Sequence, residues 1–73
     1  MNRQQGRIIF YAKKMFVDEL LSASIYRSLA SMHKRKSVVE KLLRMADMET
    51  GHAGFWARFL MRRRVDILSI KDE

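Results

Sequence analysis

The chain contains no cysteine, no proline and only three glycines among its 73 residues. Without cysteine it can form neither a disulfide framework nor a four-cysteine metal site. Without proline, and with few turn residues, long uninterrupted helices are favoured, and no segment shows the alternation typical of a strand. These absences predict an all-α protein.

The length of the chain sets a second limit. Seventy-three residues allow one domain at most. A domain this small usually lacks a core that is stable alone, and without disulfides the common remedy is oligomerisation. No apolar run approaches the roughly 18 residues that span a bilayer, and residues 1–7 are polar and basic with no signal-peptide core behind them. We therefore expect a cytoplasmic chain that associates with copies of itself.

Positive charge is unevenly distributed along the sequence. The formal net charge of +7 is concentrated at residues 34–36, at residues 62–64 and near the N-terminus. Such charge can attract nucleic acid, anionic lipid or an acidic partner. For each cluster taken separately, a solvated helix end is the simpler interpretation.

The first helix is expected from about Gln4 to His33, a length of roughly 40 Å at 1.5 Å per residue. Apolar or small residues recur along it at steps of three and four, and Glu19 lies on the same line. The helix ends in basic residues, whose charge suits the negative end of a helix dipole. The other residues of this stripe are Ile8, Ala12, Met15, Ala23, Tyr26 and Ala30.

The second helix is expected from Val38 to about Arg64. Ser37 and Glu40 have the spacing of a capping box, in which Ser37 caps the first turn and Glu40 reaches back to it. A link of about four residues forces the two helices into an adjacent antiparallel pair. Residues 1–64 are therefore predicted to form a helical hairpin, and residues 65–73 a tail without a clear pattern. The stripe of the second helix is Val38, Leu42, Met45, Glu49, His52, Trp56 and Phe59.

Both helices carry more apolar residues than one stripe holds. Two helices packed only on each other could not bury so wide a surface, whereas a four-helix bundle made from two hairpins could. Gly51 and Gly54 would each weaken an exposed helix by roughly 1 kcal/mol, so we expect a neighbouring helix to approach closely there. The additional apolar residues are Phe16, Leu20, Leu21, Leu43, Ala46, Met48, Ala53 and Phe55.

Glu19, Glu49 and His52 are the candidate metal ligands. Residues three apart on a helix point the same way, about one turn apart, so Glu49 and His52 can reach one metal ion. Glu19 lies at a comparable depth on the first helix. All three lie within apolar stripes, where a charge is costly unless it is paired or binds a metal. Carboxylate oxygens combined with an imidazole nitrogen suit iron, manganese or zinc better than calcium or copper.

The chain carries only half of the ligands that a two-metal bundle uses. Bundle proteins that bind two irons supply a Glu-x-x-His from each of two helices and a lone Glu from each of two others. This chain has one copy of each, so a dimer would contain four carboxylates and two imidazoles. Two simpler interpretations remain open. Glu-x-x-His pairs are common on exposed helices, and a coiled-coil dimer can use buried polar residues to fix its register.

Tyr26 lies two turns after Glu19 on the same face. It is either a core residue with a satisfied hydroxyl or a hydrogen-bond donor to a ligating carboxylate. Asp18 and Asp47 are interpreted as surface charges, because neither lies on a stripe. His33 is nearly four turns from Glu19, which favours a role at the helix end.

The residues around this candidate site resemble the ferritin-like/rubrerythrin superfamily. The resemblance rests on Glu19 with Tyr26 seven residues later, a short turn, and the run Ala-Asp-Met-Glu-Thr-Gly-His-Ala-Gly-Phe-Trp at residues 46–56; it covers roughly residues 10–64. Within the superfamily the chain is most similar to the ferritin-like domains attached to membrane proteins of the vacuolar iron transporter family, through residues 25–30 and 52–56. Encapsulated ferritins, which are also two-helix chains, are the nearest soluble alternative.

The resemblance implies a di-iron carboxylate site, with Glu19, Glu49 and His52 as ligands from each subunit and Tyr26 beside them. It also implies oxidation of Fe(II) by oxygen, or capture of Fe(II) for delivery to a membrane transport domain in the same longer chain. Residues 62–64 would then lie at the cytoplasmic face of a membrane. Two features depart from rubrerythrins: the chain has two helices in place of four, and it has no rubredoxin-type cysteine site.

The sequence thus predicts an all-α hairpin that dimerises into a four-helix bundle and binds two iron ions between its subunits, with no nucleic-acid partner. Manganese or zinc is the alternative metal. The alternative from another functional class is a metal-free basic helical dimer that binds anionic lipid or nucleic acid through residues 34–36 and 62–64. Its binding would be salt-sensitive and indifferent to Glu49→Ala.

Overall fold

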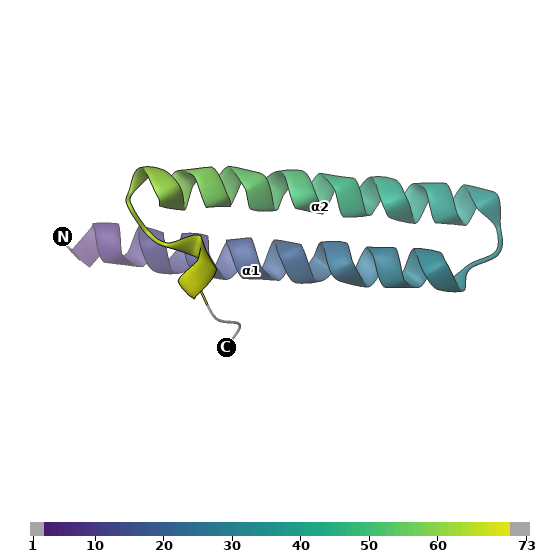
Figure 1. The fold of residues 1–73 in the computed structure, drawn as a ribbon, viewed down its shortest axis with the longest axis horizontal. Coiled ribbons are helices and arrows are strands. Elements are labelled where there is room, and N and C mark those ends of the chain that lie inside the picture. The colour runs from purple at the N-terminus through teal and green to yellow at the C-terminus, as the bar shows by residue number, and fades with distance from the viewer. Residues whose placement is uncertain (1–2, 71–73) are drawn as a thin grey trace.

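The structure is a computed structural model, and it describes residues 3–70 of the chain. Two long helices, α1 (Arg3–Met32) and α2 (Lys36–Arg62), run antiparallel and are joined by a three-residue link, as Figure 1 shows. A single turn of 3₁₀-helix, η1 (Ile67–Ser69), follows them. Residues 3–70 contain no strand, and the molecule measures 50 × 20 × 18 Å. The predicted all-α hairpin is confirmed.

The two helices meet along a seam in which small residues recur. Ala12, Ala23, Ala46 and Ala53 are at most 1% exposed, and Leu60 is fully buried. Because alanine has only a methyl side chain, these positions let the two backbones lie close together. The seam residues follow one another at steps of three and four: Ile9, Ala12, Phe16, Glu19, Ala23, Tyr26 and Ala30 in α1, and Val39, Leu42, Ala46, Glu49, Ala53, Trp56 and Leu60 in α2.

The stripes predicted from the sequence are rotated relative to this seam. In α1, Ile9 and Phe16 lie in the seam, whereas the predicted Ile8 and Met15 lie beside it, and Ile8 is 48% exposed. The displaced predictions in α2 are Val38, Met45, His52 and Phe59, each one position before a seam residue. These helices are apolar over a wider arc than the seam occupies. Periodicity finds the middle of that arc, which need not face the partner helix.

The predicted capping box at the start of α2 is wrong. Arg35 occupies the N-cap position and no side chain caps the helix; the amides of Val38 and Val39 donate to the Arg35 carbonyl oxygen instead. Since the helix begins at Lys36, Ser37 already lies inside its first turn. The Glu40 carboxylate lies 3.9 Å from the Lys36 ammonium.

The chain reverses direction after α2 and covers the open end of the hairpin (Figure 1). The amide of Val65 donates to the Leu60 carbonyl and that of Arg64 to the Met61 carbonyl, which is the Schellman pattern at a helix C-terminus. Arg64 takes the left-handed conformation, with φ of 60°. Three apolar residues that follow, Val65, Ile67 and Ile70, pack against the cluster of Ile9, Ala12 and Leu60.

The predicted domain boundary at residue 64 stays a prediction, and residues 71–73 lie outside the described part of the chain. Neither α1 nor α2 contains an apolar stretch of the length and hydropathy that a membrane span requires.

Enlarging a seam alanine should destabilise the hairpin. Ala23 is 1% exposed, so Ala23→Leu must force the helices apart or strain neighbouring side chains, at a cost of about 1–3 kcal/mol. Urea unfolding followed by circular dichroism measures this change. Ser24→Leu is the matched control, because Ser24 is exposed and leucine favours helix more than serine does. Equal stability of the two variants would contradict the close packing of the seam.

Gly51 is not used for close packing within this chain. A Cβ atom at Gly51 would meet no atom within 4 Å, and one at Gly54 would meet only the Nη1 atom of Arg58, at 3.3 Å. The predicted close approach of a neighbouring helix is therefore not found within the hairpin.

Replacing Gly51 by alanine should therefore stabilise the protein. An exposed helical glycine costs about 1 kcal/mol relative to alanine, because its backbone is freer in the unfolded state. We expect Gly51→Ala to raise the free energy of unfolding by about this amount in a urea titration. A loss of stability would instead indicate that another chain packs closely on Gly51.

Candidate metal centre

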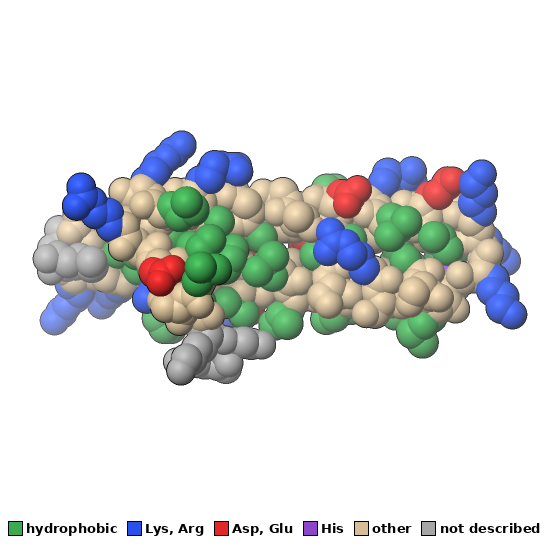
Figure 2. Space-filling view, viewed as in Figure 1, with side chains coloured by type: hydrophobic (Ala, Val, Ile, Leu, Met, Phe, Trp, Pro, Cys, Tyr) green, Lys and Arg blue, Asp and Glu red, His purple; other side chains and the backbone are tan. Residues whose placement is uncertain are grey.

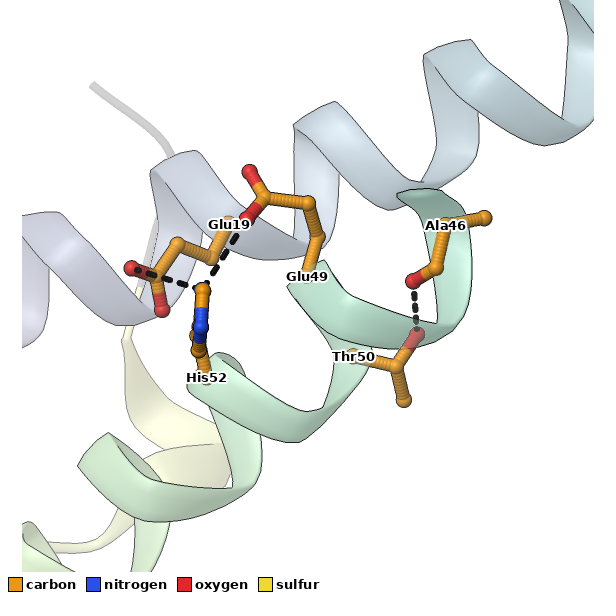
Figure 3. Close-up of polar contacts among 5 residues, drawn as sticks. All are labelled: Glu19, Ala46, Glu49, Thr50 and His52. Atoms are coloured by element: carbon orange, nitrogen blue, oxygen red, sulfur yellow. Dashed lines mark hydrogen bonds and ion pairs between the residues drawn. The ribbon is translucent and has the colours of Figure 1, made fainter. Parts of the chain in front are cut away.

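Glu19, Glu49 and His52 converge near the middle of the hairpin, as Figure 3 shows. The Nδ1 atom of His52 lies 3.0 Å from Oε1 of Glu49, on the same helix, and 3.9 Å from Oε1 of Glu19, on the facing helix. The structure thus brings together the three predicted ligands. Their role as ligands stays a prediction.

The seam explains how the side chains meet. Glu19 and Glu49 occupy seam positions, so each carboxylate points toward the other helix. His52 follows Glu49 by three residues and therefore lies on the same side of α2, about one turn further on. Ala53, beside it in the seam, is 1% exposed and keeps the backbones close. A carboxylate on α1 can therefore reach an imidazole on α2.

The three side chains differ in their exposure. The Glu19 side chain is 13% exposed and that of Glu49 24%, whereas the His52 side chain is 54% exposed. The prediction that all three are enclosed by the apolar stripes is therefore right for the two carboxylates and wrong for the imidazole. The reason is the rotation of the stripe, since Ala53 takes the seam position and His52 lies at its edge.

Glu19 is in an unfavourable environment, because part of its carboxylate is buried without a partner. Its Oε2 atom is buried and has no hydrogen-bond partner, the one such side-chain atom among residues 3–70. Burial raises the pKa of Glu19; His52 opposes this by favouring the charged form, and the Glu49 carboxylate adds to the increase. The neighbouring Trp56 indole makes a smaller contribution that lowers the pKa. A buried carboxylate oxygen without a partner costs free energy that a bound cation would offset.

The cluster is not a complete metal site by itself. Within residues 3–70, no group of three or more His, Cys, Asp or Glu side chains is arranged so that it could hold a metal ion. Asp18, next to Glu19, pairs with Lys14 at 3.5 Å on the surface of α1. Further ligands would have to come from outside the described chain.

Tyr26 lies half-buried in the seam, and the described residues show no hydrogen bond between its hydroxyl and Glu19. Its interpretation as a hydrogen-bond donor to a ligand stays a prediction. Trp56 packs edge-on against Tyr11, Phe55 and Phe59, with ring centroids 5.0–5.7 Å apart. Trp56 connects this aromatic cluster to Glu19, whose pKa it lowers.

A cross-helix hydrogen bond near the site has no signal in the sequence. The Nη2 atom of Arg27 donates to the Thr50 hydroxyl at 2.7 Å, and this hydroxyl donates to the Ala46 carbonyl at 3.0 Å. Thr50 lies between Glu49 and His52, so the bond ties the turn that carries both candidate ligands to α1. Residues 27 and 50 are related only through the register of the hairpin, which no motif or spacing rule could reveal.

Comparison with known proteins assigns the fold to a family. A protein-family model described as Rubrerythrin matches residues 13–73, a range that includes Glu19, Glu49 and His52. Neither the curated proteins nor the solved structures provide a match. The match covers most of the chain and is consistent with the all-α hairpin. The chain therefore belongs to the rubrerythrin family, as a ferritin-like iron-binding domain.

Proposed function

We propose that this chain forms half of a di-iron carboxylate site and that a second copy supplies the other half. The observation that carries the proposal is the buried, unpartnered Oε2 atom of Glu19, which lies in a cluster with Glu49 and His52. Each chain contributes two carboxylates and one imidazole. Two chains contribute the four carboxylates and two imidazoles that di-iron helical bundles use.

The donor set and the family together favour iron. Carboxylate and imidazole donors suit iron, manganese and zinc alike, and rubrerythrin-family domains generally bind iron. When bound, iron supplies one-electron redox chemistry with dioxygen as the oxidant. The residues of this chain hold the ion: Glu19 and Glu49 supply negative charge that favours the higher oxidation state, and His52 completes the donor set. Fe(II) capture, oxidation and delivery are all compatible with these roles.

The exposure of the three residues suggests how an ion enters. His52 lies at the edge of the seam and reaches solvent, whereas Glu19 is enclosed. An incoming cation would meet the imidazole and Glu49 before the buried carboxylate. In the metal-free hairpin, the Nδ1 atom of His52 lies close to both carboxylates.

A membrane context belongs to the same proposal. Residues 62–64 are three consecutive exposed arginines at the end of α2. Such a cluster suits the cytoplasmic side of a membrane. In a longer chain, residues 65–73 would link the hairpin to a membrane domain that transports iron, as the resemblance to the vacuolar iron transporter family suggests.

Iron binding tests the proposal. Under anaerobic conditions we expect the chain to bind about one Fe(II) per subunit, as measured by elemental analysis after gel filtration. Glu49→Gln should reduce the bound iron at least tenfold, because it removes a charged donor. Asp47→Asn is the matched control: it removes one carboxylate from an exposed position two residues away and should change nothing. Iron retained by Glu49→Gln, or absent from the wild type, would contradict the proposal and favour a metal-free module.

Glu19 should oppose the stability of the metal-free protein. Its pKa is raised in the folded state, so its stabilising contribution is present when the group is protonated and is lost as pH rises through the folded-state pKa. At pH 7, where the carboxyl of the unfolded chain is ionised, the raised pKa of the folded state therefore means that Glu19 destabilises the fold. We expect Glu19→Gln to raise the free energy of unfolding at pH 7 by about 1 kcal/mol while reducing iron binding. Below about pH 4, where the wild-type carboxyl is also protonated, the two proteins should be equally stable.

Urea titrations at pH 7 and at acidic pH, with a chelator present, measure this difference. A destabilising effect of Glu19→Gln at pH 7 would show that the ionised carboxylate is satisfied within the metal-free protein.

A further inference from the structure

We infer that the second copy docks on one particular side of the hairpin, the side on which His52 lies. This inference rests on the proposed shared site and specifies where its other half binds. Two sides flank the seam. The His52 face consists of the positions that come one residue before a seam residue, and the Arg27 face consists of those that come one residue after. Successive helical residues are 100° apart, so these two sets lie on opposite sides of the seam.

Contacts across the seam confirm that the two faces are distinct. On one side His52 approaches Glu19 at 3.9 Å. On the other side Arg27 donates to Thr50 at 2.7 Å. Figure 3 shows His52 and Glu49 directed toward Glu19, while Thr50 points elsewhere from the same helix. The polar groups of Arg27 and Thr50 are already bonded to each other, whereas the carboxylate–histidine cluster is incomplete.

The His52 face is the more apolar of the two. Apolar residues occupy ten of its fourteen positions, the exceptions being Asp18, Ser22, Lys41 and His52. On the Arg27 face they occupy only six of fourteen, and four formal charges interrupt them: Lys13, Arg27, Glu40 and Asp47. Six large side chains of the His52 face are 38–61% exposed, namely Ile8, Tyr11, Ile25, Leu29, Met48 and Phe55. A solvent-exposed apolar face of this extent marks an interaction surface.

The distribution of charge favours a copy of this chain as the occupant. In the view of Figure 2, Lys and Arg side chains lie mainly toward the two ends of the molecule, and one group lies nearer its middle. Residues 15–26 of α1 and 45–57 of α2 contain no Lys or Arg at all. The middle of the His52 face is therefore nearly free of repulsive positive charge, although the chain carries a net charge of +7. Two copies can therefore bring these middle segments, which lack Lys and Arg, into contact with each other.

The dimensions of the hairpin and the position of its carboxylate–histidine cluster are also compatible with a second copy on the His52 face. The hairpin is 50 Å long and 20 Å wide, so one side is large enough for a standard interface of about 800 Å² per partner. Glu19, Glu49 and His52 lie near the midpoints of their helices. A two-fold axis at that level overlays the hairpins along most of their length and brings the two clusters together. The copy thus buries the apolar face and supplies the missing donors in one contact.

A charge placed on each face distinguishes them. Ile25 is 57% exposed on the His52 face, and Leu20 is 43% exposed on the Arg27 face of the same helix. We expect the wild type to sediment at twice its 8.7 kDa mass, both without metal and with one Fe(II) per chain under anaerobic conditions. Ile25→Glu should sediment as a monomer with unchanged helicity by circular dichroism and with iron binding weakened at least tenfold. Leu20→Glu should remain a dimer.

A second variant tests the docking face from the other helix. Phe55→Glu changes the same face from α2 and replaces Ile25→Glu if that variant does not fold. A monomeric wild type in both conditions, or a dimer that survives Ile25→Glu and Phe55→Glu but not Leu20→Glu, would overturn the docking face. If Ile25→Glu is monomeric yet binds iron as the wild type does, the docking face holds and the shared site fails. If Glu49→Gln loses iron but stays dimeric, the docking face and the shared site are both supported.

Discussion

A carboxylate in a seam of alanines is the constraint on which the rest of this small protein depends. The alanines of α1 and α2 let two helices lie close enough for Glu19 to reach His52 across the seam. The same close packing removes water from one oxygen of Glu19 and leaves it without a partner. A chain of 73 residues has little core with which to offset such a group. A bound cation would satisfy this oxygen, and domains of the rubrerythrin family generally bind iron. We propose that iron is the cation that Glu19 binds.

Stability and function oppose each other at this position. The metal-free hairpin would be more stable with a neutral side chain at residue 19, because burial disfavours the charged form. In the proposed dimer, Glu19 would become a metal ligand, and cation binding would offset the free energy that its burial costs on folding. The apolar His52 face would gain in the same way, because a second copy would remove its exposed side chains from water. Metal binding and assembly would then each offset one unfavourable feature of the isolated hairpin.

Much of this arrangement could be predicted from the sequence. The absence of proline and the spacing of apolar residues predict two long antiparallel helices, and the helix bounds differ from those found by at most two residues. The three candidate ligands were identified because Glu-x-x-His and a lone Glu lie within apolar stripes.

Periodicity could not locate the seam, because both helices are apolar over more than one face. The predicted stripes therefore point between the partner helix and the His52 face, and this is why His52 is more exposed than expected. The capping box failed because α2 begins one residue before Ser37, and the Arg27–Thr50 hydrogen bond depends on a register that no local pattern encodes.

The central claim is that the iron site belongs to two chains together. Native mass spectrometry of the protein after anaerobic addition of Fe(II) tests it directly, because it reports the number of chains and the number of irons in the same particle. We expect a dimer carrying two irons as the main loaded species, and no monomer that carries iron. Monomers that each carry one tightly bound iron would contradict it.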